Sequence, residues 1–166
     1  MTSAIDMGEY STGEAYNSMT ILRDGSGQLV GLLGEMCFAS WLATNRISYR
    51  HLGSEKGHHD FELDNEITVD VKTKLRMVPY KSSYEGHVTS AQKDYDCRLY
   101  VFASVTDGVA TLAGWTGKRE FWDVCEEFEE GDKSDGNFRE RASAGKLTYS
   151  KMRPMSELLK LIKNLT

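Results

Sequence analysis

The segment HHDFELDNEITVDVKTK, residues 58–74, places Asp60, Asp70 and two lysines in a strand–turn–strand pattern. In its second half, apolar and polar residues alternate, which is the period-2 pattern of a strand with two distinct faces. Asp70 and Lys72 therefore project from the same face, one pleat repeat apart. The Phe-Glu-Leu that follows Asp60 predicts a short neighbouring strand, joined to the first by a tight turn. The carboxylates of Asp60 and Asp70 can then converge on one divalent cation beside a lysine, an arrangement that suits metal-assisted hydrolysis of a phosphodiester.

This segment resembles the active-site motif of the PD-(D/E)XK nuclease superfamily. His59 and Asp60 stand where the family has Pro-Asp, and residues 70–72, Asp-Val-Lys, stand where it has (Asp/Glu)-x-Lys. The resemblance covers roughly residues 26–105. It implies an α/β fold with a restriction-endonuclease-like core, in which a mixed central β-sheet is flanked by helices. The chain's small size is also similar to that of phage-encoded or mobile-element endonucleases and junction resolvases.

Upstream of the motif, residues 26–47 carry apolar side chains at helical spacing, which predicts a long helix with Ser26 as its N-cap. Glu35 is the one ionisable residue between Asp24 and Arg46. A buried carboxylate is costly, and it persists where a metal or another partner offsets the desolvation. In the family that this segment resembles, a glutamate on the helix before the first core strand completes the metal site. The alternative is a glutamate that reaches solvent at the edge of the apolar stripe.

Two nearby carboxylates repel each other unless a cation is bound between them, and carboxylate oxygen is the ligand that Mg²⁺ prefers. The resemblance implies a catalytic set of Glu35, Asp60, Asp70 and Lys72, with Glu35, Asp60 and Asp70 as ligands of Mg²⁺, for which Mn²⁺ can substitute. Lys72 would orient the attacking water or stabilise developing charge. The alternative interpretation is a surface hairpin whose charges are solvated.

Length and composition favour one compact domain at residues 26–166, preceded by an extended arm at residues 1–25. No apolar stretch approaches the ~20 residues that cross a bilayer, and the start lacks a signal-peptide pattern. Cys37, Cys97 and Cys125 are widely spaced within apolar patterns, which is typical of reduced core cysteines. We therefore expect a cytoplasmic protein that contacts no membrane, with a homodimer as an open alternative.

The remaining elements follow from local patterns. Residues 99–105 form a continuous apolar run that predicts a buried central strand. Three more strands are expected: a first strand at 47–52, a strand at 109–115 after a turn at Asp107 and Gly108, and an edge strand at 147–149. A helix is expected at about 118–130, capped by Thr116, with Phe121, Val124, Cys125 and Phe128 on its inner face. A last helix has Pro154 in its first turn and carries Met155, Leu158, Leu159, Ile162 and Leu165.

The net charge is −5, but the charges are segregated along the chain. Residues 120–135 hold eight acids and one lysine, whereas residues 71–93 hold five bases and one acid, and residues 138–153 hold five bases and one acid. The two basic stretches can follow a phosphate backbone, or they can be ordinary solvated loops. The candidate nucleic-acid contacts are Lys74, Arg76, Lys81, Gln92 and Lys93.

Gln92 is singled out because RecB-related nucleases of the superfamily carry a Gln-x-x-x-Tyr motif after the lysine strand. Here the spacing from Gln92 to Tyr95 is one residue short. A short helix capped by Thr89 or Ser90 can present Gln92 to the active face, and a plain polar helix residue is the alternative.

These patterns predict a Mg²⁺-dependent deoxyribonuclease whose partner is DNA. Three alternatives stay open: a nuclease-fold module that binds nucleic acid or a protein without cutting, a different metal hydrolase, and an interaction module built on the acidic helix. A non-nuclease metal hydrolase would be expected to supply histidine ligands at metal spacing, and the sequence has none.

Overall fold

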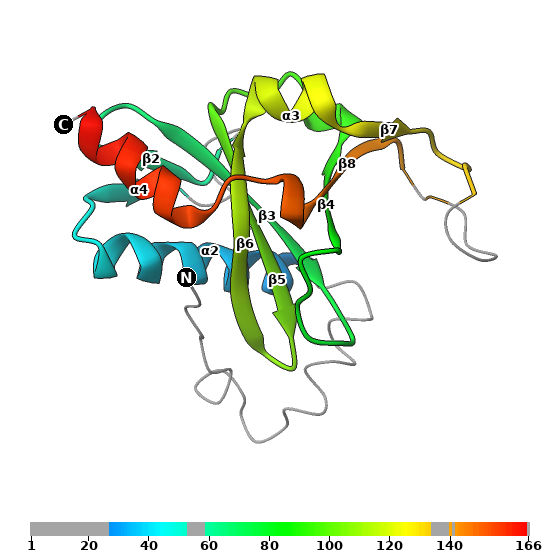
Figure 1. Ribbon diagram of the computed structural model, residues 1–166, viewed down its shortest axis with the longest axis horizontal. Coiled ribbons are helices and arrows are strands. Elements are labelled where there is room, and N and C mark those ends of the chain that lie inside the picture. The colour runs from blue at the N-terminus through cyan, green and yellow to red at the C-terminus, as the bar shows by residue number, and fades with distance from the viewer. Residues whose placement is uncertain (1–26, 53–58, 134–139, 141, 166) are drawn as a thin grey trace.

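The structure, a computed structural model, describes residues 27–52, 59–133, 140 and 142–165. A five-stranded sheet with the order β1-β2-β3-β5-β6 runs through its centre (Figure 1). β3 and β5 are parallel, and every other neighbouring pair is antiparallel. The fold is therefore α/β with a mixed central sheet flanked by helices, which confirms that part of the prediction. The five strands are β1 (Tyr49–His51), β2 (Phe61–Leu63), β3 (Thr68–Leu75), β5 (Leu99–Thr106) and β6 (Val109–Gly117).

One face of the central sheet is covered by two helices, α2 (Gly27–Thr44) and α4 (Met155–Asn164). The two helices and the sheet bury one apolar cluster, which is the largest favourable contribution to folding. Gly34 lets α2 approach the sheet closely, because a Cβ there would lie 1.8 Å from Thr73 Oγ1. Among the described residues, no helix is both long and apolar enough to cross a bilayer.

The opposite face carries a second, smaller layer. A three-stranded antiparallel sheet with the order β4-β8-β7 consists of β4 (Glu85–Thr89), β8 (Ala144–Thr148) and β7 (Glu126–Phe128). With α3 (Lys118–Val124) and the 3₁₀ turns η3 (Ser90–Gln92) and η4 (Tyr149–Lys151), it encloses a second apolar cluster that includes Tyr100, Phe102 and Phe121. β3 therefore runs between two layers, and its alternate residues face one or the other.

The hairpin predicted from the period-2 pattern is confirmed. β2 and β3 pair antiparallel, with Phe61 opposite Val69. Glu66 takes a left-handed conformation (φ 63°), and the backbone N–H of Leu63 donates to the carbonyl of Ile67. The long helix, the buried strand at 99–106 and the strand that follows Asp107 and Gly108 are also confirmed.

The helix expected at 118–130 is wrong in its second half. α3 ends at Val124, and the chain becomes extended at Cys125 (φ −67°, ψ 155°) and pairs as β7 with β8. Of the expected inner face, Phe121 is buried, but Val124 is 60% exposed. The acidic residues that follow Cys125 are compatible with a helix or a strand, and pairing with β8 favours the strand. Thr116 is buried within β6 and does not cap α3.

Two smaller predictions also need correction. The strand expected at the sheet edge is β8, and it lies in the middle of the second sheet, between β4 and β7. Leu165 lies beyond the end of α4 and is 58% exposed, so it is not part of the inner face. Three predicted features fall wholly or mostly outside the described residues: the arm at residues 1–25, the 53–59 loop, of which only His59 is described, and Arg139 and Arg141 of the second basic stretch.

Candidate functional site

Asp70 and Lys72 share one face of β3, the face directed toward the second layer. Lys72 Nζ lies 2.6 Å from Asp70 Oδ2, and the Lys72 ammonium is 5.9 Å from the centre of the Tyr100 ring. Asp70 is only 6% exposed, so its carboxylate is one of the few buried charged groups in the described part of the chain. A buried carboxylate needs a cation or several donors, and Lys72 supplies part of that requirement.

Asp60 reaches the same region from the start of β2. Because β2 begins at Phe61, opposite Val69, the backbone N–H of Val71 extends past the end of its neighbouring strand. That N–H donates to Asp60 Oδ2 at 2.7 Å, and the backbone N–H of Asp60 donates to the carbonyl of Val69. Both bonds fix the Asp60 carboxylate beside Asp70.

The two carboxyl groups influence each other. Burial is the largest effect on both, and it raises the pKa of Asp60 above its usual value and the pKa of Asp70 to about 6. The negative charge of Asp60 adds to the rise in the pKa of Asp70, and the positive charge of Lys72 opposes it. The negative charge of Glu35 adds to the rise in the pKa of Asp60. A hydrogen bond between the two groups raises the pKa of Asp70 and lowers that of Asp60. Lys72 supplies one positive charge beside the two carboxyl groups.

Glu35 lies at the edge of this site and not at its centre. Its Oε2 is 2.6 Å from His51 Nε2, so α2 is joined to β1. The imidazole of His51 stacks on Phe61, with ring centres 4.7 Å apart. The partner that offsets the desolvation of Glu35 is therefore His51 in this structure. Glu35 is still close enough to raise the pKa of Asp60.

Gln92 faces the same site. η3 follows Thr89, which takes an extended conformation at the N-cap, and Lys72 Nζ donates to Gln92 Oε1 at 3.0 Å. Lys72 is therefore held between Asp70 and Gln92, with 13% of its side chain exposed.

The donor set suits a hard cation, because all of its members are carboxylates and two of them, buried Asp70 and half-buried Asp60, have raised pKa values. However, within the described ranges no three His, Cys, Asp or Glu side chains stand together as a preformed metal cage. Asp60 and Asp70 form a pair, and Glu35 faces His51. The residues therefore fit a cation held by Asp60 and Asp70, and Glu35 joins only by exchanging its histidine partner.

The predicted nucleic-acid contacts occupy different environments. Lys81 is exposed, with its ammonium 5.9 Å from the centre of the Tyr84 ring. Arg76 is half-buried, lies 4.4 Å above the Tyr84 ring, and donates from Nη2 to the carbonyl of Glu85 at 2.6 Å. Lys93 forms an ion pair with Glu127 at 2.8 Å. Lys81 alone of these three has the environment of a free surface charge.

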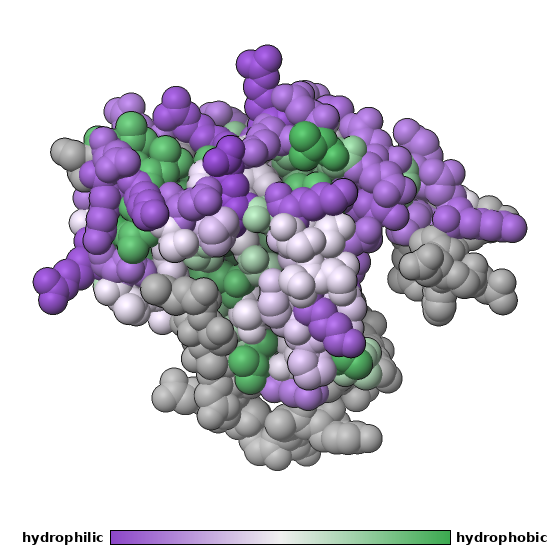
Figure 2. Space-filling model, in the orientation of Figure 1, coloured by the Kyte–Doolittle hydropathy of each residue, from purple (hydrophilic) through white to green (hydrophobic). Residues whose placement is uncertain are grey.

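The acidic stretch is largely separate from this site. Hydrophilic side chains gather over α3 and β7, where that stretch lies (Figure 2). Glu126 and Glu127 of β7 pair with Lys146 and Lys93. The segregation of charge seen along the chain is thus partly neutralised by ion pairs within the second layer.

Sequence reasoning missed His51, His87 and Tyr149. His51 is 16 residues from Glu35, and no local pattern connects them. His87 lies on β4, where its ring nitrogens are 3.3 and 3.5 Å from Lys74 Nζ. These contacts join segments far apart in sequence, so sheet pairing had to be known first.

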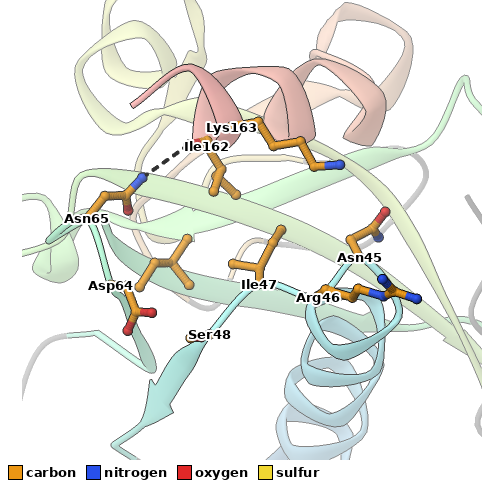
Figure 3. Close-up of a pocket in the computed structure, with 9 residues that line it drawn as sticks. Asn45, Arg46, Ile47, Ser48, Asp64, Asn65, Ile162 and Lys163 are labelled. Carbon is orange, nitrogen blue, oxygen red and sulfur yellow. Dashed lines mark hydrogen bonds between the residues drawn. The ribbon is translucent and has the colours of Figure 1, made fainter. Parts of the chain in front are cut away.

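A separate pocket of about 160 Å³ opens between the C-terminal ends of α2 and α4 (Figure 3). Arg46 and Lys163 border it, and the Asn65 side chain donates to the carbonyl of Ile162 at 3.5 Å. Asp64 is the single acid in its lining. It lacks the paired carboxylates of the other site, so it is the weaker candidate for catalysis.

No protein-family model matches this chain, and a search of curated proteins found no match to it.

Proposed function

We propose that this protein is a metal-dependent nuclease that hydrolyses phosphodiester bonds of DNA, with Mg²⁺ as its cofactor. The observation that carries the proposal is the pair of Asp70, which is buried, and Asp60, which is half-buried, two carboxyl groups with raised pKa values beside the ammonium of Lys72. Perturbed carboxyl groups beside a specific charge partner are typical of functional sites. The motif resemblance and the mixed sheet support the same conclusion.

Asp60 and Asp70 would hold the cation, and Glu35 would contribute after releasing His51. Bound Mg²⁺ would lower the pKa of its water and neutralise charge at the phosphorus. The backbone N–H of Val71 orients the Asp60 carboxylate, so that its second oxygen stays available. That bond is retained whether or not Asp60 has a second partner.

Lys72 has the position of a group that orients a nucleophile or stabilises charge on a phosphate. Asp70 and Gln92 hold its ammonium at 2.6 and 3.0 Å. Preorganised donors of this kind contribute most where water is excluded, and 13% of the Lys72 side chain is exposed. Gln92 is a positioning residue in this proposal, because it acts through Lys72.

A second candidate is a nuclease-fold module that binds nucleic acid or a protein without cutting it. It is favoured by one observation, that each acid of the set already has a partner within the protein: His51 for Glu35, the Val71 N–H for Asp60, and Lys72 for Asp70. A pair of salt-bridged acids can also be structural.

The test is degradation of end-labelled and circular DNA with Mg²⁺, with Mn²⁺ and with EDTA. We expect cleavage with either metal and none with EDTA. Linear, nicked, single-stranded and four-way-junction DNA, with an RNA of the same sequence, identify the substrate. DNA binding without cleavage under every metal condition would favour the second candidate.

Asp70→Asn removes a proposed metal ligand and should abolish cleavage, and Asp64→Asn is its matched control. Asp64 lies on the exposed turn of the same hairpin. Removing a metal ligand is expected to lower the cleavage rate by at least about a hundredfold. The Asp64 variant should cleave as the wild type does, so equal loss in both variants would indicate damage to the hairpin.

A further inference from the structure

A second cavity adjoins the carboxylate site, on the same side of β3. It has a volume of about 230 Å³ and lies between β3 and β4, and it is lined by Lys72, Thr73, Lys74, Gly86, His87 and Tyr149. Lys72 therefore borders both the carboxylate pair and this cavity. A water molecule occupies roughly 30 Å³, so the cavity has room for a small anionic group with ordered water.

Lys74 is the unusual residue of the cavity. It is largely shielded from solvent, and in the part of the chain that the structure describes its ammonium has no carboxylate in ion-pair contact. Its contacts are the two ring nitrogens of His87, at 3.3 and 3.5 Å. A half-buried cation whose contacts are with a neutral partner is partly desolvated without compensation, and an anion in the cavity would offset that cost.

The surroundings of Lys74 are positive. Burial lowers the pKa of Lys74, and Arg76 lowers it further. Burial also lowers the pKa of His87 to about 4, with Lys74, Arg76 and Lys146 adding to the effect, so the imidazole is neutral at pH 7. Several cations thus surround one cavity.

Two acids oppose this field. Glu85 and Glu140 each raise the pKa of Lys74, but burial and Arg76 outweigh them. Glu85 Oε2 lies 3.8 Å from His87 Nε2, which is beyond hydrogen-bond distance. The positive potential at Lys74 is therefore only partly neutralised by the protein.

Neutral donors complete the wall. A neutral imidazole carries one N–H, so His87 can donate to an anion from one ring nitrogen. Tyr149 is 3% exposed, and within the described residues its hydroxyl makes no hydrogen bond of normal geometry, although the Arg76 guanidinium lies 5.6 Å from the centre of its ring. A buried hydroxyl in a cavity wall that makes no such bond is a donor available to a ligand.

We propose that this cavity is a subsite for a phosphate group, in which Lys74 supplies the charge and His87 and Tyr149 supply neutral hydrogen-bond donors. Phosphate suits the set because it accepts several hydrogen bonds at once and carries the negative charge that Lys74 lacks. Binding of free phosphate does not depend on the proposed nuclease activity. Its use to hold DNA rests on that proposed function, with Lys72 as the link between the subsite and the carboxylate pair.

A phosphate group can reach the cavity from two sources, a strand terminus or an internal phosphodiester. Both have the chemistry that Lys74 and His87 would recognise, and they differ in charge and in the continuity of the chain. The first experiment tests phosphate itself, and the second distinguishes the sources.

The first experiment titrates inorganic phosphate into the metal-free protein, with the His87 side-chain signals followed by NMR and the melting temperature measured in parallel. We expect saturable shifts of the His87 signals and a rise in melting temperature with phosphate. Lys74→Met keeps the aliphatic stem and removes the charge, and it should weaken phosphate binding about tenfold or more. Lys160→Met, on the exposed face of α4, should bind as the wild type does.

The melting temperature without phosphate separates a binding role from a structural one. If Lys74 is an unpaired cation kept for a ligand, Lys74→Met should melt at the same temperature or higher, and phosphate should narrow or reverse the gap. Tyr149→Phe should weaken phosphate binding several-fold with little change in melting temperature, because the hydroxyl makes no hydrogen bond of normal geometry within the described residues.

The second experiment measures binding of oligonucleotides in EDTA, with a 5′-phosphate, a 3′-phosphate or two hydroxyl ends. If a terminus is bound, one phosphorylated end should increase affinity about tenfold and Lys74→Met should remove that increase. If an internal phosphodiester is bound, the three oligonucleotides should bind alike and Lys74→Met should weaken all of them.

Unchanged phosphate binding in both Lys74→Met and Tyr149→Phe would overturn the proposal, as would a His87 signal that does not respond to phosphate. Loss of metal-dependent cleavage is a separate result, because these measurements are made without metal. A protein that binds phosphate here and cuts nothing would retain the subsite and lose the nuclease assignment.

Discussion

Glu35 Oε2 lies 2.6 Å from His51 Nε2, and this contact joins the helix before the motif to the first strand of the sheet. The same carboxylate adds to the raised pKa of Asp60. Glu35 therefore has two possible roles that exclude each other at any moment, as a tether to His51 or as a ligand beside Asp60. The two roles predict different behaviour for the variants of each partner.

We expect Glu35→Gln to lower the Mg²⁺-induced rise in melting temperature, and His51→Gln to maintain or increase it. The first change removes a ligand, whereas the second removes a competitor for that ligand. Thermal denaturation across a Mg²⁺ titration measures both. If Glu35 is only a tether, both variants should lose the same small stability, about 1 kcal/mol or less, and show the wild-type Mg²⁺ response.

Asp70→Asn is expected to increase the stability of the metal-free protein at pH 8 while abolishing cleavage. The pKa of Asp70 rises from 3.8 to about 6 on folding, so its contribution to stability is fully present below pH 3.8 and is lost as the pH rises through 6. An asparagine side chain does not ionise, so its burial carries no such pH-dependent cost. The gain is at most about 3 kcal/mol at pH 8, at about 1.4 kcal/mol per pKa unit, and it should vanish below pH 4.

Urea denaturation at several pH values, compared between the wild type and Asp70→Asn, checks this. A constant difference across pH 4 to 8 would mean that the carboxyl group is not destabilised by burial. Lys72 keeps Gln92 as an acceptor in the variant, so its ammonium is not left without a partner.

Substitutions of Lys81 and Arg76 are expected to have different effects, although both residues belong to the same basic stretch. Lys81→Ala should weaken DNA binding and reduce the salt dependence by roughly one unit of slope, because an exposed lysine that contacts one phosphate releases about one counterion. Arg76→Met should instead lower stability by about 1–3 kcal/mol, because Arg76 donates to the Glu85 carbonyl and lies over the Tyr84 ring.

The measurements are DNA affinity at three salt concentrations and urea denaturation of both variants. Equal salt slopes for Lys81→Ala and wild type would place the DNA surface elsewhere. A stable Arg76→Met protein with weak DNA binding would reassign Arg76 from structure to binding.

Local patterns predicted the part of the fold that local interactions determine. The alternation after residue 66 is sufficient to place Asp70 and Lys72 on one face, and the apolar run at 99–106 is sufficient to identify the central strand. The second sheet was not predicted, because β4, β7 and β8 are short and their stability comes from pairing with one another. Gly145 illustrates the difficulty, since its role is to admit α3, with a Cβ there only 2.7 Å from Cys125 Sγ.

The candidate site likewise contains residues that local spacing could predict and residues that only tertiary contacts bring together. The spacing within one hairpin is sufficient to bring Asp60, Asp70 and Lys72 close together, which is the arrangement in the structure. His51, His87 and Tyr149 come from three different elements. His51 meets Glu35, His87 meets Lys74 and Tyr149 reaches the cavity wall only through the tertiary arrangement. The sequence marked Glu35 as a carboxylate that needs a partner, but it contained no pattern that identified His51.

The last prediction concerns His87 and the acid side of the stability curve. Burial and the nearby Lys74, Arg76 and Lys146 lower the pKa of His87 from 6.5 to about 4. The unfolded chain therefore binds more protons than the folded chain between these values, so the His87 contribution is present above pH 6.5 and is lost as the pH falls through 4. His87→Gln, which has no proton to take up, should be less sensitive to acid across that range. The expected result, in phosphate-free buffer, is a wild-type-minus-variant stability difference that falls by up to about 3 kcal/mol between pH 7 and pH 4. A difference that stays level would show that His87 titrates as an exposed histidine, and the imidazole would then carry a proton beside Lys74 at pH 5.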